Sequence, residues 1–236
     1  MRTRIRRGVA VALTVSALTL TAACGGSSDK GDGAAKGKDA AKPADKPAAA
    51  ALTAEQMKAG LLELKDLPAG WKAEAAAPSE DMPAADKPEC KPINAIMGDK
   101  IEGTTLGDNA EFGDKDSSIL AELLATFSDD KAATDFMKTV ATAADTCTGF
   151  SFTAEGQKVP VKVEKLTAPT AGEESTAVRL SMEMAPGMTI VSDLLVARQG
   201  AGLMRLAYVP TNQANHKNFD DLAKRAGDKF VKAAQS

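Results

Sequence analysis

Three alternating apolar runs joined by short turns dominate the second half of the chain. They cover residues 178–184, 188–198 and 203–209, with connections at 185–187 (Ala-Pro-Gly) and 199–202 (Gln-Gly-Ala-Gly). Alternation with a period of two predicts strands, and turns that contain Gly or Pro between such strands predict consecutive hairpins. Consecutive hairpins build an antiparallel sheet, and this feature constrains the fold more than any other.

Helical periodicity marks three other segments. Thr53 and Gln56 have the form of a capping box, which predicts that the first helix begins at this point. The acidic residues at 129–130 open the second and strongest helical pattern, which ends by Thr148. The predicted helices cover about 54–65, 130–147 and 218–234.

Two further alternating runs, 119–127 and 159–163, predict additional strands. Helices therefore occur before, within and after the strand runs. This order predicts the α+β class, with a twisted antiparallel sheet whose helices cover a face. No internal repeat is present.

The start of the chain has the layout of a secretory signal peptide. Its first seven residues include four arginines and no acid, and residues 8–23 are uncharged and rich in Ala, Val, Leu and Thr. The uncharged run has 16 residues, fewer than the roughly 20 that a membrane-spanning helix needs. A permanent transmembrane helix is therefore the weaker alternative.

Residues 20–26 (Leu-Thr-Ala-Ala-Cys-Gly-Gly) resemble the cleavage box of bacterial lipoproteins, although the usual Leu three places before the cysteine is Thr21 here. We expect a lipoprotein signal peptide over 1–23. Cys24 would then receive palmitate-type acyl chains, and two such chains hold a protein stably at the cell membrane. The alternative is ordinary signal peptidase cleavage nearby, which would leave Cys24 a free thiol.

After Cys24, the chain up to residue 51 contains small residues, Lys, Asp and Pro, and no large apolar side chain. Such a segment does not offset the entropy of ordering, so we expect a disordered tether over 24–51. The remaining residues, 52–236, are sufficient for a single domain with a real core. The expected location of this domain is extracellular, on the extracytoplasmic face.

Charge excludes one class of partner. The chain has 29 basic and 32 acidic residues, and four of the basic ones lie in the signal peptide, so the mature chain is near −7. A net acidic domain without a basic stripe is a poor candidate for binding nucleic acid. Membrane contact should therefore depend on the lipid anchor.

Cysteine use agrees with an exported protein. Once Cys24 is assigned to lipid, Cys90 and Cys147 remain as an even pair in an oxidising compartment, so we expect a disulfide between them. Closing this loop would stabilise the fold by roughly 4 kcal/mol in the chain-entropy model. No neighbouring Cys or His completes a metal site around either cysteine.

No catalytic or metal-binding constellation stands out. His216 is the only histidine, and no Gly-x-Ser-x-Gly elbow accompanies it, so we interpret it as a surface or capping residue. The acids at 108, 111, 114 and 116 do not follow the calcium-loop pattern and suit a solvated turn between strands. We therefore predict no cofactor, no metal and no catalytic residue.

The sequence also allows the hypothesis of an apolar ligand pocket. Flexible methionines at 182, 184, 188 and 204 would suit an adaptable apolar pocket, but core filling explains them equally well. Trp71 follows a Pro-Ala-Gly turn, and we interpret it as a packing anchor for the first helix. The ligand-binding residues stay unknown at this level.

Several short motifs resemble one known family. They are the Leu-rich first helix, Asp-Leu-Pro-Ala-Gly-Trp at 66–71, Cys90 in a Pro-rich loop, and a helix ending Ala-Ala-Asp-Thr-Cys at 143–147. Together they look like the extracellular sensor domain of the mycobacterial kinase PknH and its lipoprotein relatives. The resemblance implies an antiparallel sheet with helices, a cleft and a sensing or ligand-binding role. That family normally has two disulfides, whereas this chain can form one.

Three functional hypotheses follow. The first is a noncatalytic, membrane-anchored surface lipoprotein that binds a small molecule or a cell-envelope protein. The second is a carrier of lipid or glycolipid, which needs an apolar cavity of several hundred cubic ångströms. The third is an envelope hydrolase without a catalytic histidine, which needs two close carboxylates in opposed environments.

Overall fold

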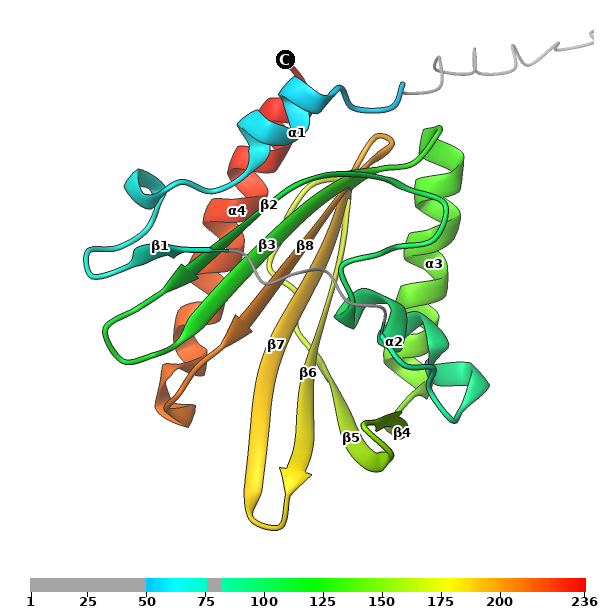
Figure 1. The fold of residues 1–236 in the computed structure, drawn as a ribbon. Coiled ribbons are helices and arrows are strands. Elements are labelled where there is room, and N and C mark those ends of the chain that lie inside the picture. The colour runs from blue at the N-terminus through cyan, green and yellow to red at the C-terminus, as the bar shows by residue number, and fades with distance from the viewer. Residues whose placement is uncertain (1–49, 76–81) are drawn as a thin grey trace, which may run out of the picture. The chain divides into compact units, whose positions relative to one another are not determined.

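The computed structural model of the chain describes residues 50–75 and 82–236. Eight strands in this part form one antiparallel sheet, in the order β1-β2-β3-β8-β7-β6-β5-β4 (Figure 1). The strands are β1 (Lys72–Glu74), β2 (Thr105–Gly113), β3 (Ile119–Thr126), β4 (Gly149–Ala154), β5 (Gln157–Leu166), β6 (Glu174–Ala185), β7 (Met188–Gln199) and β8 (Gly202–Val209).

Four α-helices and three short 3₁₀ helices accompany the sheet in the described residues. Together they confirm the α+β class. The α-helices are α1 (Ala54–Gly60), α2 (Lys91–Met97), α3 (Asp130–Thr146) and α4 (Phe219–Ala234), and the 3₁₀ helices are η1 (Leu64–Asp66), η2 (Pro88–Cys90) and η3 (Gln213–Asn218).

The predicted signal peptide, Cys24 and most of the tether lie outside the described residues. Within 50–75 and 82–236, no helix combines the length and the apolar character needed to cross a membrane.

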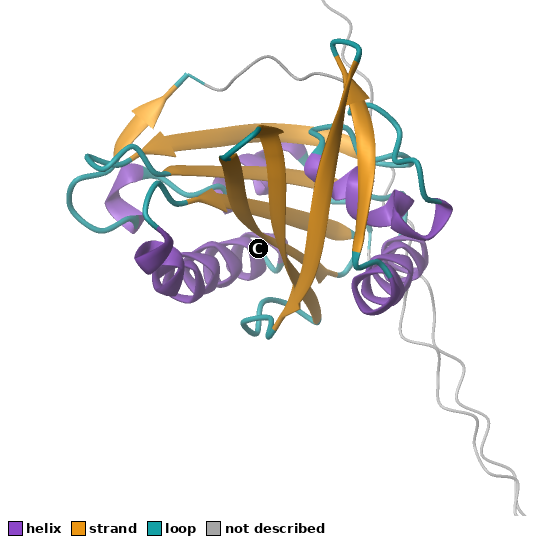
Figure 2. Cartoon of the chain, turned by 90° about the horizontal axis from the view of Figure 1, so that it is seen from below, coloured by secondary structure: helices purple, strands orange, loops and turns teal. Residues whose placement is uncertain are grey.

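Helices pack on both faces of the sheet, whereas the sequence pattern predicted helices that cover a face. On one side α2 and α3 pack against the sheet, and on the other side α1 and α4 do so (Figure 2). Strand β7 shows why two cores exist. Leu194 and Val196 belong to the α3 side, while Leu195 and Ala197 belong to the α4 side, and all four are buried.

Local capping signals fix where helices α1 and α3 begin. The Thr53 hydroxyl accepts a hydrogen bond from the Gln56 amide at 3.1 Å, and the Gln56 side chain accepts one from the Thr53 amide at 2.9 Å, which completes the capping box. Asp129 caps α3 by accepting from the Ala132 amide at 2.8 Å. Helix α1 is shorter than predicted because the backbone becomes extended at Leu61.

Helix α3 connects the middle of the sheet to its far edge. It follows β3 and precedes β4, which is the last strand of the sheet. From β4 the chain returns strand by strand through hairpins until β8 pairs with β3, with Leu120 opposite Tyr208. The predicted hairpins between β6, β7 and β8 are therefore confirmed, and they close the sheet at its centre.

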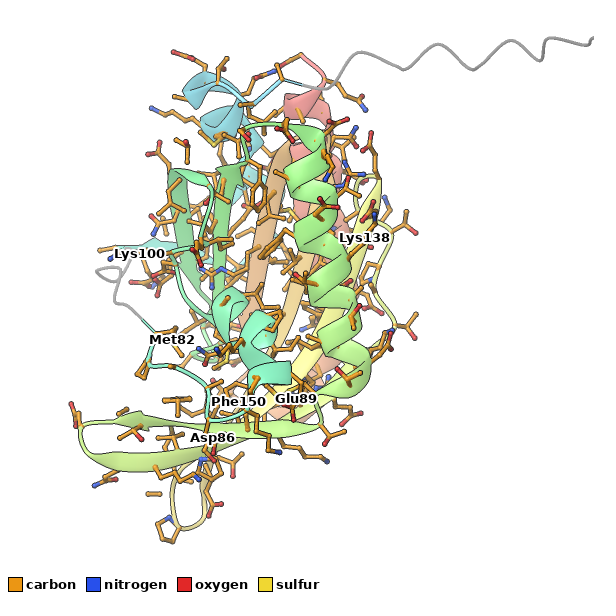
Figure 3. All side chains as sticks on the ribbon, turned by 90° about the vertical axis from the view of Figure 1, so that its right-hand side faces the viewer. Met82, Asp86, Glu89, Lys100, Lys138 and Phe150 are labelled. Carbon is orange, nitrogen blue, oxygen red and sulfur yellow. A yellow bond between two sulfur atoms is a disulfide. The ribbon has the colours of Figure 1, made fainter. Side chains whose placement is uncertain are left out.

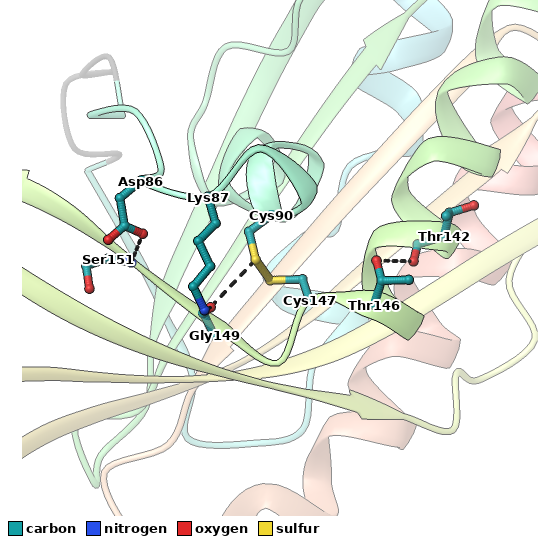
Figure 4. The surroundings of a disulfide bond; sticks show 8 residues. All are labelled: Asp86, Lys87, Cys90, Thr142, Thr146, Cys147, Gly149 and Ser151. Carbon is teal, nitrogen blue, oxygen red and sulfur yellow. Dashed lines mark hydrogen bonds between the residues drawn. A yellow bond between two sulfur atoms is a disulfide. The ribbon is translucent and has the colours of Figure 1, made fainter.

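The structure contains the predicted disulfide between Cys90 and Cys147. It joins the η2–α2 segment to the end of α3, and both cysteines are buried (Figure 4). The neighbouring loop is held on β4, because Asp86 accepts from the Ser151 amide at 2.7 Å and donates its own amide to the Ser151 carbonyl at 2.9 Å. This loop and Phe150 lie together at the foot of α2 (Figure 3).

Gly172 marks the closest backbone approach outside the regular strands. Its φ is +66°, and an added Cβ would lie 2.3 Å from the carbonyl oxygen of Arg198. The following residue, Glu173, donates its amide to the same carbonyl at 2.8 Å. Glycine is required here both by the left-handed conformation and by the lack of space.

Candidate functional site

A cavity of about 320 Å³ opens at the end of the sheet where β2 turns into β3. Three segments that are distant in sequence build its walls, and we call it the Trp71 pocket. Its lining residues are 68–71 from the turn before β1, 114–116 from the β2–β3 turn, Lys217 and Asn218 from the end of η3, and Asp221 and Leu222 from the start of α4.

Trp71 forms an aromatic wall of this pocket. The turn before it passes through Gly70, whose φ of +105° suits glycine. The indole is partly exposed and packs against the ring of Tyr208, with centroids 6.4 Å apart and a tilt of 53°. The sequence predicted Trp71 as a packing anchor for the first helix, whereas its ring contact in the structure is with Tyr208 of β8, and it also lines the cavity.

The β2–β3 turn is held by the carboxylate of Asp114. One oxygen of this group, Oδ1, accepts from the amides of Asp116 and Ser118, each at 2.8 Å. The turn also contains Ser117 with a φ of +62°. Asp116 forms an exposed ion pair with Lys115 at 2.9 Å. Two of the four acids considered for calcium are therefore engaged in turn structure.

Two buried hydroxyl groups lie behind the pocket wall. Tyr208 and Ser118 are both fully buried, and neither hydroxyl has a hydrogen-bond partner of ordinary geometry in the described structure. Burial raises the pKa of Tyr208, while the nearby side chains of Ser118 and Asn218 lower it. Asn218 is also one of the residues that line the pocket.

A buried ionic group lies next to Tyr208 on the same face of the sheet. Asp193 is opposite Tyr208 in the β7–β8 register and is completely buried. It receives two hydrogen bonds from Arg179, at 2.6 and 3.0 Å, and a third contact from His216 Nδ1 at 2.5 Å. Such bidentate pairing is the strong form of a charge-assisted hydrogen bond.

The interpretation of His216 as a surface residue is therefore wrong. Its side chain is only 11% exposed because η3 lies over the sheet and directs the imidazole toward Asp193. Lys217 and Asn218, the next two residues, line the pocket. Asp193 thus fixes the segment that forms one wall of the pocket.

No sequence motif marks this buried group. Asp193 and Arg179 face each other across β6 and β7, inside two of the runs predicted as strands. A usable signal did exist, because Asp193 precedes the unbroken apolar run at 194–197. Such runs indicate strands that are buried on both faces, where a charge requires a partner.

The other residues considered from the sequence are spread over the fold. Asp108 and Glu111 lie along β2, away from the turn that contains Asp114. Met204 is buried in the core, while Met182, Met184 and Met188 lie on the β6–β7 hairpin. Among residues 50–75 and 82–236, no three His, Cys, Asp or Glu side chains are grouped so that they would hold a metal ion.

A wider hollow of about 670 Å³ runs between the η1 region and α4. Its cations are largely paired with neighbouring acids. Lys229 contacts Glu63 at 2.8 Å and Asp66 at 2.6 Å, and with Lys65 it lowers the pKa of Glu63 to about 2. Because no aromatic side chain lines it, this groove is a weaker candidate site than the Trp71 pocket.

Comparison with solved structures identifies the architecture. The crystal structure of the extracellular domain of PknH from Mycobacterium tuberculosis superposes with a TM-score of 0.56 and 14% identity, over 79% of this chain and 98% of that domain. The chain has the fold of the PknH extracellular domain. The resemblance noted in the sequence is therefore confirmed at the level of the fold.

A second solved structure, of an uncharacterized protein from Mycobacterium smegmatis, matches with a TM-score of 0.40 and 11% identity, over 77% of this chain and 93% of that chain. No family model and no curated protein sequence matches this chain. The site must accordingly be interpreted from its own geometry.

Proposed function

We propose that this protein is a noncatalytic, extracytoplasmic lipoprotein that binds a small polar ligand in the Trp71 pocket. Cys24 is its lipid anchor, and residues 24–51 are the tether. The observation that supports binding most directly is the pocket itself, in which a partly exposed indole is combined with charged side chains from two other segments. Pockets of this size with a few placed polar groups are typical ligand sites.

Three observations support the location. The chain starts with the layout of a lipoprotein signal peptide. Its domain contains a disulfide, which persists in oxidising compartments. The solved structure with the similar fold is an extracellular domain.

The pocket walls favour a polar molecule over a lipid chain. Three aspartates and two lysines line the cavity, and these charges would have to be desolvated beneath an acyl chain. The indole face of Trp71 favours a ligand with a cationic group. The lipid-carrier hypothesis therefore receives no support from this pocket.

The buried Asp193 group supports a positioning role. Both of its carboxylate oxygens are occupied by Arg179, and one of them also contacts His216. Asp193 thus holds η3 against the sheet and sets the position of Lys217 and Asn218 at the pocket wall.

Trp71 provides the test, because it is the only tryptophan in the chain and its fluorescence reports on the pocket alone. The oxidised protein is titrated with amino acids, polyamines and quaternary ammonium compounds. We expect at least one compound to shift or quench the emission in a saturable manner. The double variant Asp116→Asn, Lys217→Ala should lose this response, and Lys138→Ala on α3 should keep it.

The proposal would be wrong if no compound in the panel changed the emission. It would also be wrong if the double variant responded with the same affinity as the wild type, since the compound would then bind outside the pocket walls.

A further inference from the structure

The β6–β7 hairpin extends beyond the strands on either side of it (Figure 1). Strand β6 pairs with β5 only as far as Met182, and β7 pairs with β8 only from Asp193 onward. Residues 183–192 therefore form a two-stranded projection. This projection exposes large apolar side chains, with Met184 at 39%, Met188 at 55% and Ile190 at 38%.

Three methionines share one face of this projection. Leu180 faces the α3 side of the sheet, so Met182, two residues further on, faces the same side and packs partly against that core. Met182 is opposite Ile190 in the register, and Ile190 and Met188 are two residues apart on the same face. Cross-strand neighbours of this kind have Cβ atoms about 5 Å apart.

A β-bulge adds Met184 to the same group. The register shifts between Glu183 and Ala185, so that Met184 and Ala185 together oppose Met188. The exposed thioethers of Met184 and Met188 thus lie across the hairpin from each other. Met182 lies two residues before Met184 on β6. Each side chain has three rotatable bonds, so the sulfur atoms can converge on one point.

We propose that these three thioethers form a binding site for a soft monovalent cation of the Cu(I) and Ag(I) class. Thioether sulfur is a ligand that such cations prefer, whereas hard cations select oxygen. The surroundings agree with this chemistry, because residues 182–192 contain one acid, Glu183, and no basic residue that would repel a cation. The site is on the opposite side of the sheet from the Trp71 pocket and is independent of it.

The exposure of the methionines supports a ligand rather than core filling. Met137 and Met204 are at most 1% exposed and fill the two cores of the domain. Met184 and Met188 cover no core, and large exposed apolar side chains that gather at one place usually mark an interaction site. Methionine differs from the other apolar residues in offering a metal ligand, and three of the four large apolar side chains on this face are methionine.

Silver provides a redox-inert probe for the test. The full chain, with any free thiol alkylated, is titrated with Ag(I) in chloride-free buffer and examined by native mass spectrometry. We expect one silver ion per chain in the wild type. The triple variant Met182→Leu, Met184→Leu, Met188→Leu should lose this ion, whereas the control Met137→Leu should retain it.

A second readout separates a local site from loss of the fold. In protein labelled with ¹³C at the methionine methyl groups, Ag(I) should shift the signals of Met182, Met184 and Met188 and leave that of Met137 unchanged. Leucine keeps the hairpin apolar, so a surface that only docks an apolar partner would be unaffected by the triple substitution. Absence of bound silver in the wild type, or full retention in the triple variant, would overturn the proposal.

Discussion

The carboxylate of Glu122 accepts a hydrogen bond from the backbone amide of Leu62 at 2.7 Å, inside the core between β3 and the segment that follows α1. Glu122 is 1% exposed, and its second carboxylate oxygen has no partner in the described structure. Desolvation by burial raises its pKa to about 8, and the Leu62 amide lowers it only partly. The protonated form is therefore the one that the folded state prefers at neutral pH.

This geometry predicts an unusual pH dependence of stability. The folded protein retains a proton that the unfolded chain releases at its ordinary pKa of 4.5, so the stabilising effect is complete below about pH 4.5. It is lost as the pH rises toward about 8. Glu122→Gln should remove this decline and make the variant more stable than the wild type at pH 8, by about 2 kcal/mol or more.

Denaturant unfolding at several pH values measures this effect. Glu164→Gln, on an exposed position of β5, serves as the matched control and should follow the wild type. Parallel pH profiles for Glu122→Gln and the wild type would contradict the assignment of a buried neutral carboxyl group.

A second prediction concerns Asp193, whose side chain is 0% exposed while that of its partner Arg179 is 29% exposed. Asp193→Asn removes the charge that pairs with Arg179, and the free energy of unfolding should fall by about 3 kcal/mol. Asp135→Asn breaks an exposed pair with Lys131 and should cost less than about 1 kcal/mol. Equal losses in the two variants would show that the Asp193 group is not buried in solution.

The disulfide gives a third prediction. Cys90 and Cys147 are 57 residues apart in the sequence, so replacing both with Ala should lower the free energy of unfolding by about 4 kcal/mol. Denaturant unfolding of the double variant, compared with the oxidised and the reduced wild type, measures this loss. The double variant should resemble the reduced protein, and a variant as stable as the oxidised protein would contradict a stabilising role.

Gly172 gives a fourth prediction because a matched control separates two effects. Gly156 also has a positive φ, +77°, but an added Cβ there would meet nothing within 4 Å. Gly156→Ala should therefore lower the free energy of unfolding by only about 1 to 2 kcal/mol, which is the cost of a left-handed backbone conformation for a residue with a Cβ. Gly172→Ala adds a collision with the Arg198 carbonyl and should cost clearly more in thermal or denaturant unfolding. Similar costs at both positions would mean that the close approach relaxes easily.

The elements with strong periodicity could be predicted from the sequence. Helices α3 and α4 and the hairpins of β6, β7 and β8 have long regular patterns, and the structure places them within a few residues of the prediction. Strand β2 was missed because Phe112 is the only buried residue among its nine. Helix α2 was missed because its seven residues are too few to show a helical period.

The packing of helices on both faces of the sheet was not predicted, for a different reason. The unbroken apolar run at 194–197 is typical of a strand with two buried faces, but we interpreted it as part of an alternating strand. The Trp71 pocket could not be predicted at all, because its walls combine residues 68–71 and 114–116 with Lys217 and Asn218. Only the tertiary fold brings these segments together.

The proposed function requires that the Trp71 pocket binds a small polar molecule. Native mass spectrometry of the oxidised protein, purified from the envelope of its own host, tests it most directly. We predict a small noncovalent mass excess that is water-soluble after denaturation and is missing from the Asp116→Asn, Lys217→Ala double variant. A wild-type protein without any added mass, or with a mass that extracts into organic solvent, would contradict the claim.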